Sequence, residues 1–142
     1  MAKVRTASCF CGAVEVSVEG DPVTQGFCHC ASCRAWTAQP VTAYALWPAP
    51  LVRVTKGADV FGHAPRNDNL ATGFCTKCGG AVLAESKLSG LTDVFPMIVH
   101  DFEFVPQSHI NYAERAIDMR DGLPKFKDMP DVAGGTGEMM PE

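Results

Sequence analysis

Seven cysteines in three groups constrain the fold of this 142-residue sequence more than any other feature. The groups, in chain order, are Cys9 and Cys11; Cys28, Cys30 and Cys33; and Cys75 and Cys78. A disulfide framework would leave one cysteine of an odd number unpaired. Closely spaced thiolates are the ligands that zinc takes in small domains, so the spacing predicts metal binding.

The first and third groups together supply four ligands. In an extended segment, side chains two residues apart point to the same face, so Cys9 and Cys11 can share a metal while Phe10 turns toward the core. The sequence CTKCGG allows a tight turn that joins Cys75 and Cys78. These four cysteines are predicted to close a structural zinc site. Buried thiols and a thioredoxin-like redox pair are the alternatives, and the two glycines after Cys78 disfavour the helix that a redox pair needs.

The middle group, CHCASCR, supplies three sulfurs. Cys28 and Cys30 share a face if a strand persists there, and Cys33 returns after a turn, while His29 points the opposite way. Three protein ligands leave a fourth position for water or substrate, which is typical of a catalytic zinc. The sequence therefore predicts a second, open zinc site and two zincs per chain. Two alternatives remain, namely a redox triad and a site closed by one of the four histidines, His29, His63, His100 or His109.

Arg34 directly follows the last of these cysteines. A guanidinium there can bind a substrate carboxylate through two hydrogen bonds or stabilise thiolate charge. An ordinary solvated arginine fits the spacing equally well. Arg34 is thus a candidate substrate-binding residue. Trp36 and Trp47 are candidates to line a pocket, with core packing as the alternative.

Charge and hydropathy exclude two classes of partner. The formal net charge is −4 and no Lys/Arg cluster stands out, so a nucleic-acid surface is not expected. No segment approaches the roughly 18 apolar residues of a membrane span, and the N-terminus has no apolar signal-peptide core. A protein with reduced cysteines in the cytoplasm is the interpretation that fits.

Short alternating segments predict a mainly β fold made of several small antiparallel sheets stapled by zinc. Strands are expected at residues 14–18, 41–47, 51–55, 59–61, 81–85 and 94–99. The best helical candidate, residues 113–119, is short. Residues 1–127 are predicted to form a single zinc-binding β domain. Residues 128–142 hold two glycines in succession and little to pack, and they are predicted to be a flexible tail.

With these motifs, the sequence resembles the glutathione-dependent formaldehyde-activating enzyme family, which also includes centromere protein V. The resemblance rests on SCFCGAVEVSVEG, CHCASCR and FCTKCGGAV, and on SHI followed by DGLPKF, and it covers residues 8 to about 126. It implies an Mss4-like fold. It also implies a structural zinc on the first and third cysteine groups, and a second zinc on the middle group, at which a thiol substrate is proposed to act.

The function implied by this resemblance is that of a carbon–sulfur lyase. Such an enzyme makes or cleaves an adduct between a thiol like glutathione and a small aldehyde, as in the synthesis of S-hydroxymethylglutathione. The expected partners are therefore a small thiol and a carbonyl compound. A non-catalytic zinc module that binds a protein or small ligand is the alternative, because fold alone does not fix function.

Overall fold

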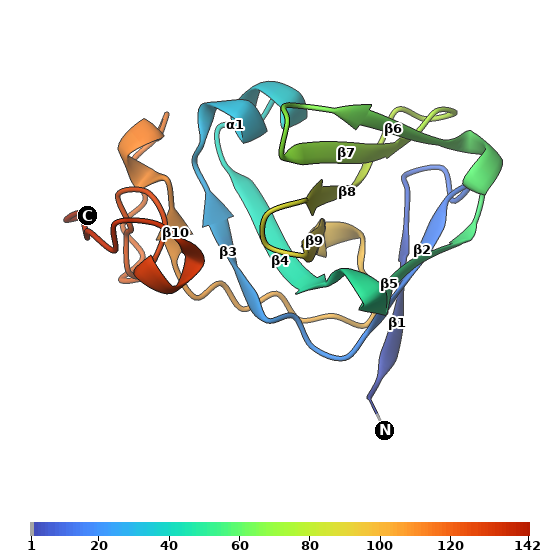
Figure 1. Cartoon of the computed structure of the whole chain (residues 1–142), viewed down its shortest axis with the longest axis horizontal. Helices are drawn as coiled ribbons and strands as arrows, with labels where there is room; N and C mark the ends of the chain where they lie inside the picture. Colours follow the sequence, from blue (N-terminus) through green and yellow to red (C-terminus); the bar gives the residue numbers. More distant parts are fainter. Residues whose placement is uncertain (1) are drawn as a thin grey trace. The chain divides into compact units, whose positions relative to one another are not determined.

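The fold is mainly β, as the sequence predicts. The computed structural model describes residues 2–142, and within them it has ten strands in two sheets and one α-helix, α1 (Ala31–Thr37). None of the helices in the described chain has the length and apolar character that a membrane span needs. The strands, shown in Figure 1, are β1 (Val4–Ser8), β2 (Glu15–Glu19), β3 (Thr24–Cys28), β4 (Thr42–Pro48), β5 (Val52–Lys56), β6 (Phe61–Pro65), β7 (Leu70–Cys75), β8 (Ala81–Ser86), β9 (Leu91–Val94) and β10 (His109–Ile110).

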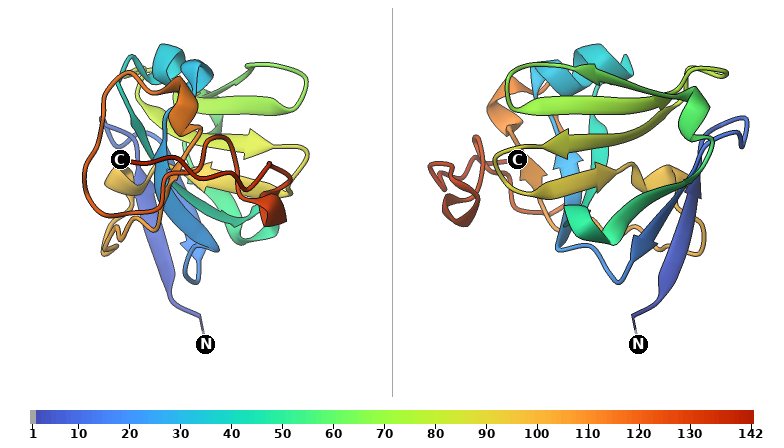
Figure 2. Two further views of the ribbon diagram at one scale, coloured as in Figure 1. Left: turned by 90° about the vertical axis from the view of Figure 1, so that its left-hand side faces the viewer. Right: turned by 45° about the vertical axis from the view of Figure 1, so that its right-hand side comes forward.

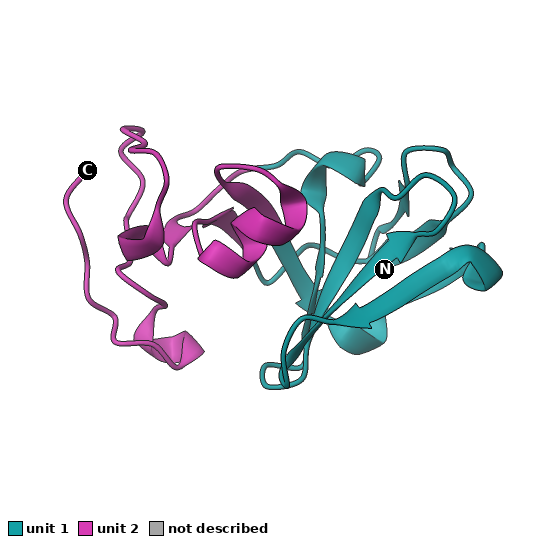
Figure 3. Cartoon of the chain, turned by 90° about the horizontal axis from the view of Figure 1, so that it is seen from above, with its two compact units in different colours: residues 1–24, 45–104 teal, residues 25–44, 105–142 magenta. Residues whose placement is uncertain are grey.

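Two compact units divide the chain, and each interleaves distant segments (Figure 3). Unit 1 takes the chain up to Thr24 together with Ala45–Phe104. Unit 2 takes Gln25–Tyr44 and Val105–Glu142. The expected boundary at residue 127 has no counterpart in this division, and the single domain stays a prediction.

Unit 1 holds a three-stranded sheet, β1-β2-β5, and a run of strands in the order β4-β9-β8-β7-β6, of which β4 enters the unit at Ala45 (Figure 2). The alternation predicted at residues 14–18 is confirmed, because Val14, Val16 and Val18 are fully buried while the residues between them are half-exposed. Trp47 is also fully buried, and its indole N–H donates to the Gly20 carbonyl at 3.0 Å. Core packing is therefore the role of Trp47.

Unit 2 contains β3, α1 and the short strand β10, which pairs in parallel with β3. In that pairing His109 lies opposite Phe27, and Ile110 lies opposite Cys28. A glycine is required at position 26, because a Cβ there would collide with the carbonyl oxygen of Ser108. The segment from Ser108 is thereby held against the strand that carries the second cysteine group.

Three predicted elements are wrong or displaced. The strand expected at 94–99 ends at Val94, because Pro96 begins a 3₁₀ turn, Pro96–Ile98. The strand expected at 59–61 is a 3₁₀ turn, Ala58–Val60, and β6 begins only after it. The helix expected at 113–119 is a 3₁₀ turn, Tyr112–Glu114. Two further 3₁₀ turns of the described chain are Ala49–Leu51 and Asp131–Ala133.

The segment predicted to be a flexible tail makes backbone hydrogen bonds in this structure. The Met140 N–H donates to the Lys125 carbonyl at 2.8 Å, and the Lys127 N–H donates to the Glu138 carbonyl at 2.8 Å. The Asp128 carboxylate also accepts from the Thr136 N–H and hydroxyl, each at 2.9 Å. Residues 128–142 thus form a hairpin-like loop, and their mobility stays a prediction.

Candidate metal centres

The first and third cysteine groups meet in unit 1. The sulfurs of these four residues all lie within 4.8 Å of one another. The Cys9 and Cys11 sulfurs are 3.7 Å apart, and those of Cys11 and Cys75 are 3.8 Å apart. A tetrahedron with zinc–sulfur distances of about 2.3 Å has edges of about 3.8 Å. The set therefore fits a tetrahedral zinc, with ligands Cys9, Cys11, Cys75 and Cys78.

Two tight turns, rather than an extended segment, bring these sulfurs together. The Gly12 N–H donates to the Cys9 carbonyl at 3.0 Å, and Gly12 has a φ of +77°. In the other turn, the Gly79 N–H donates to the Cys75 carbonyl at 2.8 Å. The expectation that Phe10 turns to the core is wrong, since its side chain is 91% exposed at the tip of the first turn.

Backbone N–H groups favour the thiolate form of two cysteines of this cluster, Cys9 and Cys78. The Val14 N–H donates to the Cys9 sulfur at 3.2 Å, and the Gly80 N–H donates to the Cys78 sulfur at 3.4 Å. Backbone N–H donation from Gly80 and Cys11 lowers the pKa of Cys78 to about 6. Thiolates are the form that binds metal, so the local backbone prepares the site for a cation.

The middle cysteine group gathers in unit 2, again with all sulfurs within 4.8 Å of one another. Cys28 ends β3, and Cys30 is the N-cap of α1, with extended backbone angles. The Cys30 sulfur accepts the Cys33 N–H at 3.2 Å, in the manner of a side-chain cap. The turn predicted between Cys30 and Cys33 is therefore the first turn of a helix that the sequence did not predict.

A cation suits this second cluster. The adjacent thiols of Cys30 and Cys33, together with burial, raise the pKa of Cys28, because thiolates side by side repel one another. A bound cation removes that repulsion. The Asn111 amide donates to the Cys28 sulfur at 3.5 Å, and Asn111 holds a left-handed backbone with a φ of +54°. Asn111 had no signal in the spacing of the cysteines, and it reaches them through the pairing of β10 with β3.

No histidine of the described chain joins the group formed by Cys28, Cys30 and Cys33. The ring of His29 is fully buried and its Nε2 lies 2.8 Å from Nδ1 of His109, so this ring is held by another histidine and is not in the sulfur group. Among the partners of the other two histidines, both in unit 1, are Glu85 for His63 and Ser8 for His100. In the described residues the site thus offers three candidate protein ligands.

A polar network continues from His29 through unit 2, buried at His29, His109 and Lys125 and exposed at Asp121. His109 Nε2 lies 2.7 Å from the Asp121 carboxylate, and the Lys125 ammonium donates to the same carboxylate at 2.5 Å. Burial alone would raise the pKa of Asp121, but hydrogen bonds from Lys125 and His109 hold it well below its usual range. Burial is the largest cause that lowers the pKa of His29 to about 4, and the nearby charges of Arg115, Lys125 and Arg34 act in the same direction. Sequence reasoning did not connect these residues.

Arg34 braces the segment that carries the three cysteines. Its Nε donates to the His29 carbonyl at 3.1 Å, and its Nη2 donates to the Glu114 carbonyl at 2.8 Å. The Glu114 carboxylate in turn accepts the Ala31 N–H at 3.1 Å. A guanidinium has five N–H donors, so these bonds leave others for a carboxylate. Substrate binding by Arg34 stays a prediction.

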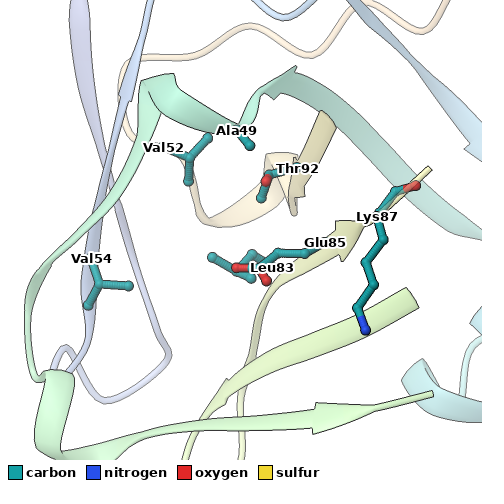
Figure 4. A pocket seen from close by; sticks show the side chains of 8 residues that line it. Ala49, Val52, Val54, Leu83, Glu85, Lys87 and Thr92 are labelled. Atoms are coloured by element: carbon teal, nitrogen blue, oxygen red, sulfur yellow. The ribbon is translucent and has the colours of Figure 1, made fainter. Parts of the chain in front are cut away.

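A cavity of about 310 Å³ lies in unit 1 (Figure 4). Its lining mixes apolar side chains with the charged groups of Glu85 and Lys87, and it includes no cysteine. The lining residues are Ala49, Val52, Val54, Leu83, Glu85, Ser86, Lys87 and Thr92. The cavity and the two cysteine clusters are therefore made of different residues.

Comparisons with a family model and with solved structures both find proteins that are similar to this chain. A family model described as "Glutathione-dependent formaldehyde-activating enzyme" matches residues 4–114, which include all seven cysteines. A crystal structure of a Rhodobacter sphaeroides protein, a structural genomics target, is similar with a TM-score of 0.54 and 20% identity. The similarity covers 69% of this chain and 90% of that chain, and it bears on the fold alone. Comparison with curated proteins gives no match.

Proposed function

The chain belongs to the glutathione-dependent formaldehyde-activating enzyme family, and on that premise we propose that it is a zinc-dependent enzyme of the carbon–sulfur lyase type. It makes or cleaves the adduct between a thiol of the glutathione class and a small aldehyde. The observation that carries the proposal is the group of three cysteines in unit 2, which offers three sulfur ligands where the group in unit 1 offers four.

The two cysteine clusters have different proposed roles, because one offers four sulfur ligands and the other offers three. Cys9, Cys11, Cys75 and Cys78 would hold a structural zinc, and Cys28, Cys30 and Cys33 would hold the catalytic one. Zinc at the three-cysteine group would supply a positive charge that favours the deprotonated, nucleophilic form of a thiol. Three thiolates donate strongly and leave the site formally anionic, so thiol chemistry is favoured over activation of water for hydrolysis.

The proposed reaction is a balanced addition. The sulfur of the thiol forms a bond to the carbonyl carbon, the π bond between carbon and oxygen opens, and the thiol proton ends on that oxygen. The reverse reaction breaks the carbon–sulfur bond and returns thiol and aldehyde. No electron acceptor is required, in keeping with a site built from cysteines and one metal.

The chain's own residues would hold this site rigid. Cys30 and Cys33 are linked by the cap of α1, and Asn111 donates to the Cys28 sulfur. Arg34 ties the cysteine segment to Glu114 and is the proposed contact for a carboxylate of the thiol substrate. Thiolate ligands need a reducing compartment, so we propose that the protein works in the cytoplasm.

Exchange NMR of glutathione with formaldehyde tests this proposal. Zinc-loaded wild-type protein is expected to accelerate the exchange between free thiol and S-hydroxymethylglutathione beyond the spontaneous rate. The Cys30→Ser variant is expected to stay folded and to lose the acceleration. The matched control is Lys87→Gln, which changes the cavity of unit 1 and leaves the cysteines intact. Loss of activity in the control with full activity in Cys30→Ser would move the reaction away from the three-cysteine group.

A further inference from the structure

Four side chains form a continuous hydrogen-bonded row in unit 2. The Lys125 ammonium contacts Oδ1 of Asp121, whose Oδ2 contacts Nε2 of His109. Nδ1 of His109 then lies 2.8 Å from Nε2 of His29. Both imidazole rings are fully buried and the lysine is 1% exposed. Asp121 is exposed, but the two rings are closed to solvent, so each ring nitrogen must have a defined role as donor or acceptor.

The proton positions along this row follow from its charged end. The Leu123 N–H and the Lys125 ammonium both donate to Oδ1 of Asp121, which is the arrangement of an ionised carboxylate. An ionised carboxylate only accepts, so the proton between it and His109 is on Nε2 of the ring. A neutral His109 ring holds only that one proton, so its Nδ1 is bare.

A bare Nδ1 on His109 also determines which nitrogen of His29 carries a proton. The hydrogen bond between the rings needs one proton, and only Nε2 of His29 can supply it. His29 consequently has a bare Nδ1 of its own. That atom is buried and has no hydrogen-bond partner in the described protein. An unsatisfied buried acceptor destabilises the fold, which favours a donor held beside it.

We propose that Asp121 and Lys125, acting through His109, are positioning residues that fix His29 as the Nε2–H tautomer and make its Nδ1 the acceptor for an internal water molecule. Water is the donor of choice because the atom is closed to solvent and a buried polar atom is commonly satisfied by an ordered water. His29 stands between Cys28 and Cys30, so the row sets the orientation of the backbone between two sulfurs of the second cluster.

The tautomers can be read directly from two-bond ¹H–¹⁵N correlation spectra of the zinc-loaded protein at neutral pH. His63→Gln and His100→Gln variants, which alter exposed histidines, assign the remaining two rings. Wild-type protein is expected to show protonated Nε2 and bare Nδ1 in both His29 and His109. A proton on Nδ1 of either ring overturns the proposal.

The Asp121→Asn variant is expected to reverse the direction of proton donation along the row. Its amide oxygen is expected to stay with the Lys125 ammonium, so the amide N–H₂ faces His109 and donates to Nε2. Both rings are then expected to switch to the Nδ1–H form. The matched control is Glu142→Gln, which removes the other carboxylate at Lys125 and leaves the histidine contact intact, so its tautomers are expected to equal those of the wild type. Unchanged tautomers in a folded Asp121→Asn variant contradict the proposal.

A crystal structure of the zinc-loaded protein supplies the second readout, which does not depend on any variant. An ordered water within hydrogen-bond distance of Nδ1 of His29 is expected. A backbone N–H at that position, or packing against carbon atoms alone, refutes the water site. Neither readout uses catalytic activity, so the result is separate from the outcome for the proposed reaction.

Discussion

Replacing Asp93 with asparagine tests how unit 1 tolerates a half-buried acid. Asp93 lies on β9, opposite Leu46 on β4 and Ala84 on β8. Its carboxyl accepts the Ala45 N–H at 3.1 Å. Burial raises the pKa of this carboxyl to about 7, against the lowering effects of the Ala45 N–H and of the Arg66 charge. An asparagine keeps the acceptor oxygen and removes the charge.

The effect of Asp93 on the free energy of unfolding follows from the difference between its proton affinity in the folded protein and in the unfolded chain. A carboxyl with a pKa near 4 in the unfolded chain and about 7 in the folded protein binds its proton more tightly when folded. Its stabilising contribution is complete below about pH 4 and is lost as the pH rises to about 7. At about 1.4 kcal/mol per pH unit, the ionised group destabilises the fold by about 4 kcal/mol above pH 7.

Urea unfolding of zinc-loaded wild type and Asp93→Asn at several pH values measures this difference. The variant is expected to be more stable, with an advantage that grows by about 1 kcal/mol between pH 6 and pH 8. Comparing the two proteins at each pH cancels the titration of the cysteines. Asp131→Asn is the control, because this exposed carboxylate also accepts a backbone N–H. An advantage that is absent, or equal for both variants, would refute the reasoning.

Three further predictions concern single residues. Cys78→Ser is expected to unfold or aggregate the protein, because a structural zinc contributes folding energy; a midpoint of thermal unfolding equal to that of the wild type would contradict it. Lys125→Met removes the ammonium that donates to the exposed Asp121 carboxylate and is expected to destabilise the protein by about 1.5–3 kcal/mol in urea unfolding. A loss below about 1 kcal/mol would show that the pair is dispensable. Gly26→Ala is expected to lower stability by about 1–3 kcal/mol, since a Cβ there meets the Ser108 carbonyl oxygen, and a neutral change in the same assay would count against that contact.

Patterns of neighbouring residues in the sequence predict those strands whose formation depends on the residues within them. Alternating valines identify β2, and the run of β-branched and aromatic residues before Pro48 identifies β4. The same reasoning fails where an apolar run contains a proline, since Pro96 turns the expected strand into a 3₁₀ turn. The helix α1 was missed because its N-cap is Cys30, a residue type absent from the usual N-cap signals.

The candidate metal sites show the same contrast. Some of their features follow from neighbouring residues, and others depend on residues far apart in the sequence. Cysteine spacing predicts both clusters, and the structure brings together the seven sulfurs in two groups of the expected membership. The exposure of Phe10 was missed, because the hydrogen bond from Gly12 closes a turn that an alternating pattern does not foresee. The contact of His29 with His109 spans 80 residues, and only the pairing of β10 with β3 creates it.

Metal content is the measurement that tests the central claim most directly. Protein purified in reducing buffer with zinc and then freed of unbound metal is expected to retain close to two zincs per chain. The Cys30→Ser variant is expected to retain about one, because the four cysteines of unit 1 are unchanged. Wild-type protein without bound zinc would contradict the account, as would a Cys30→Ser variant that holds as much zinc as the wild type.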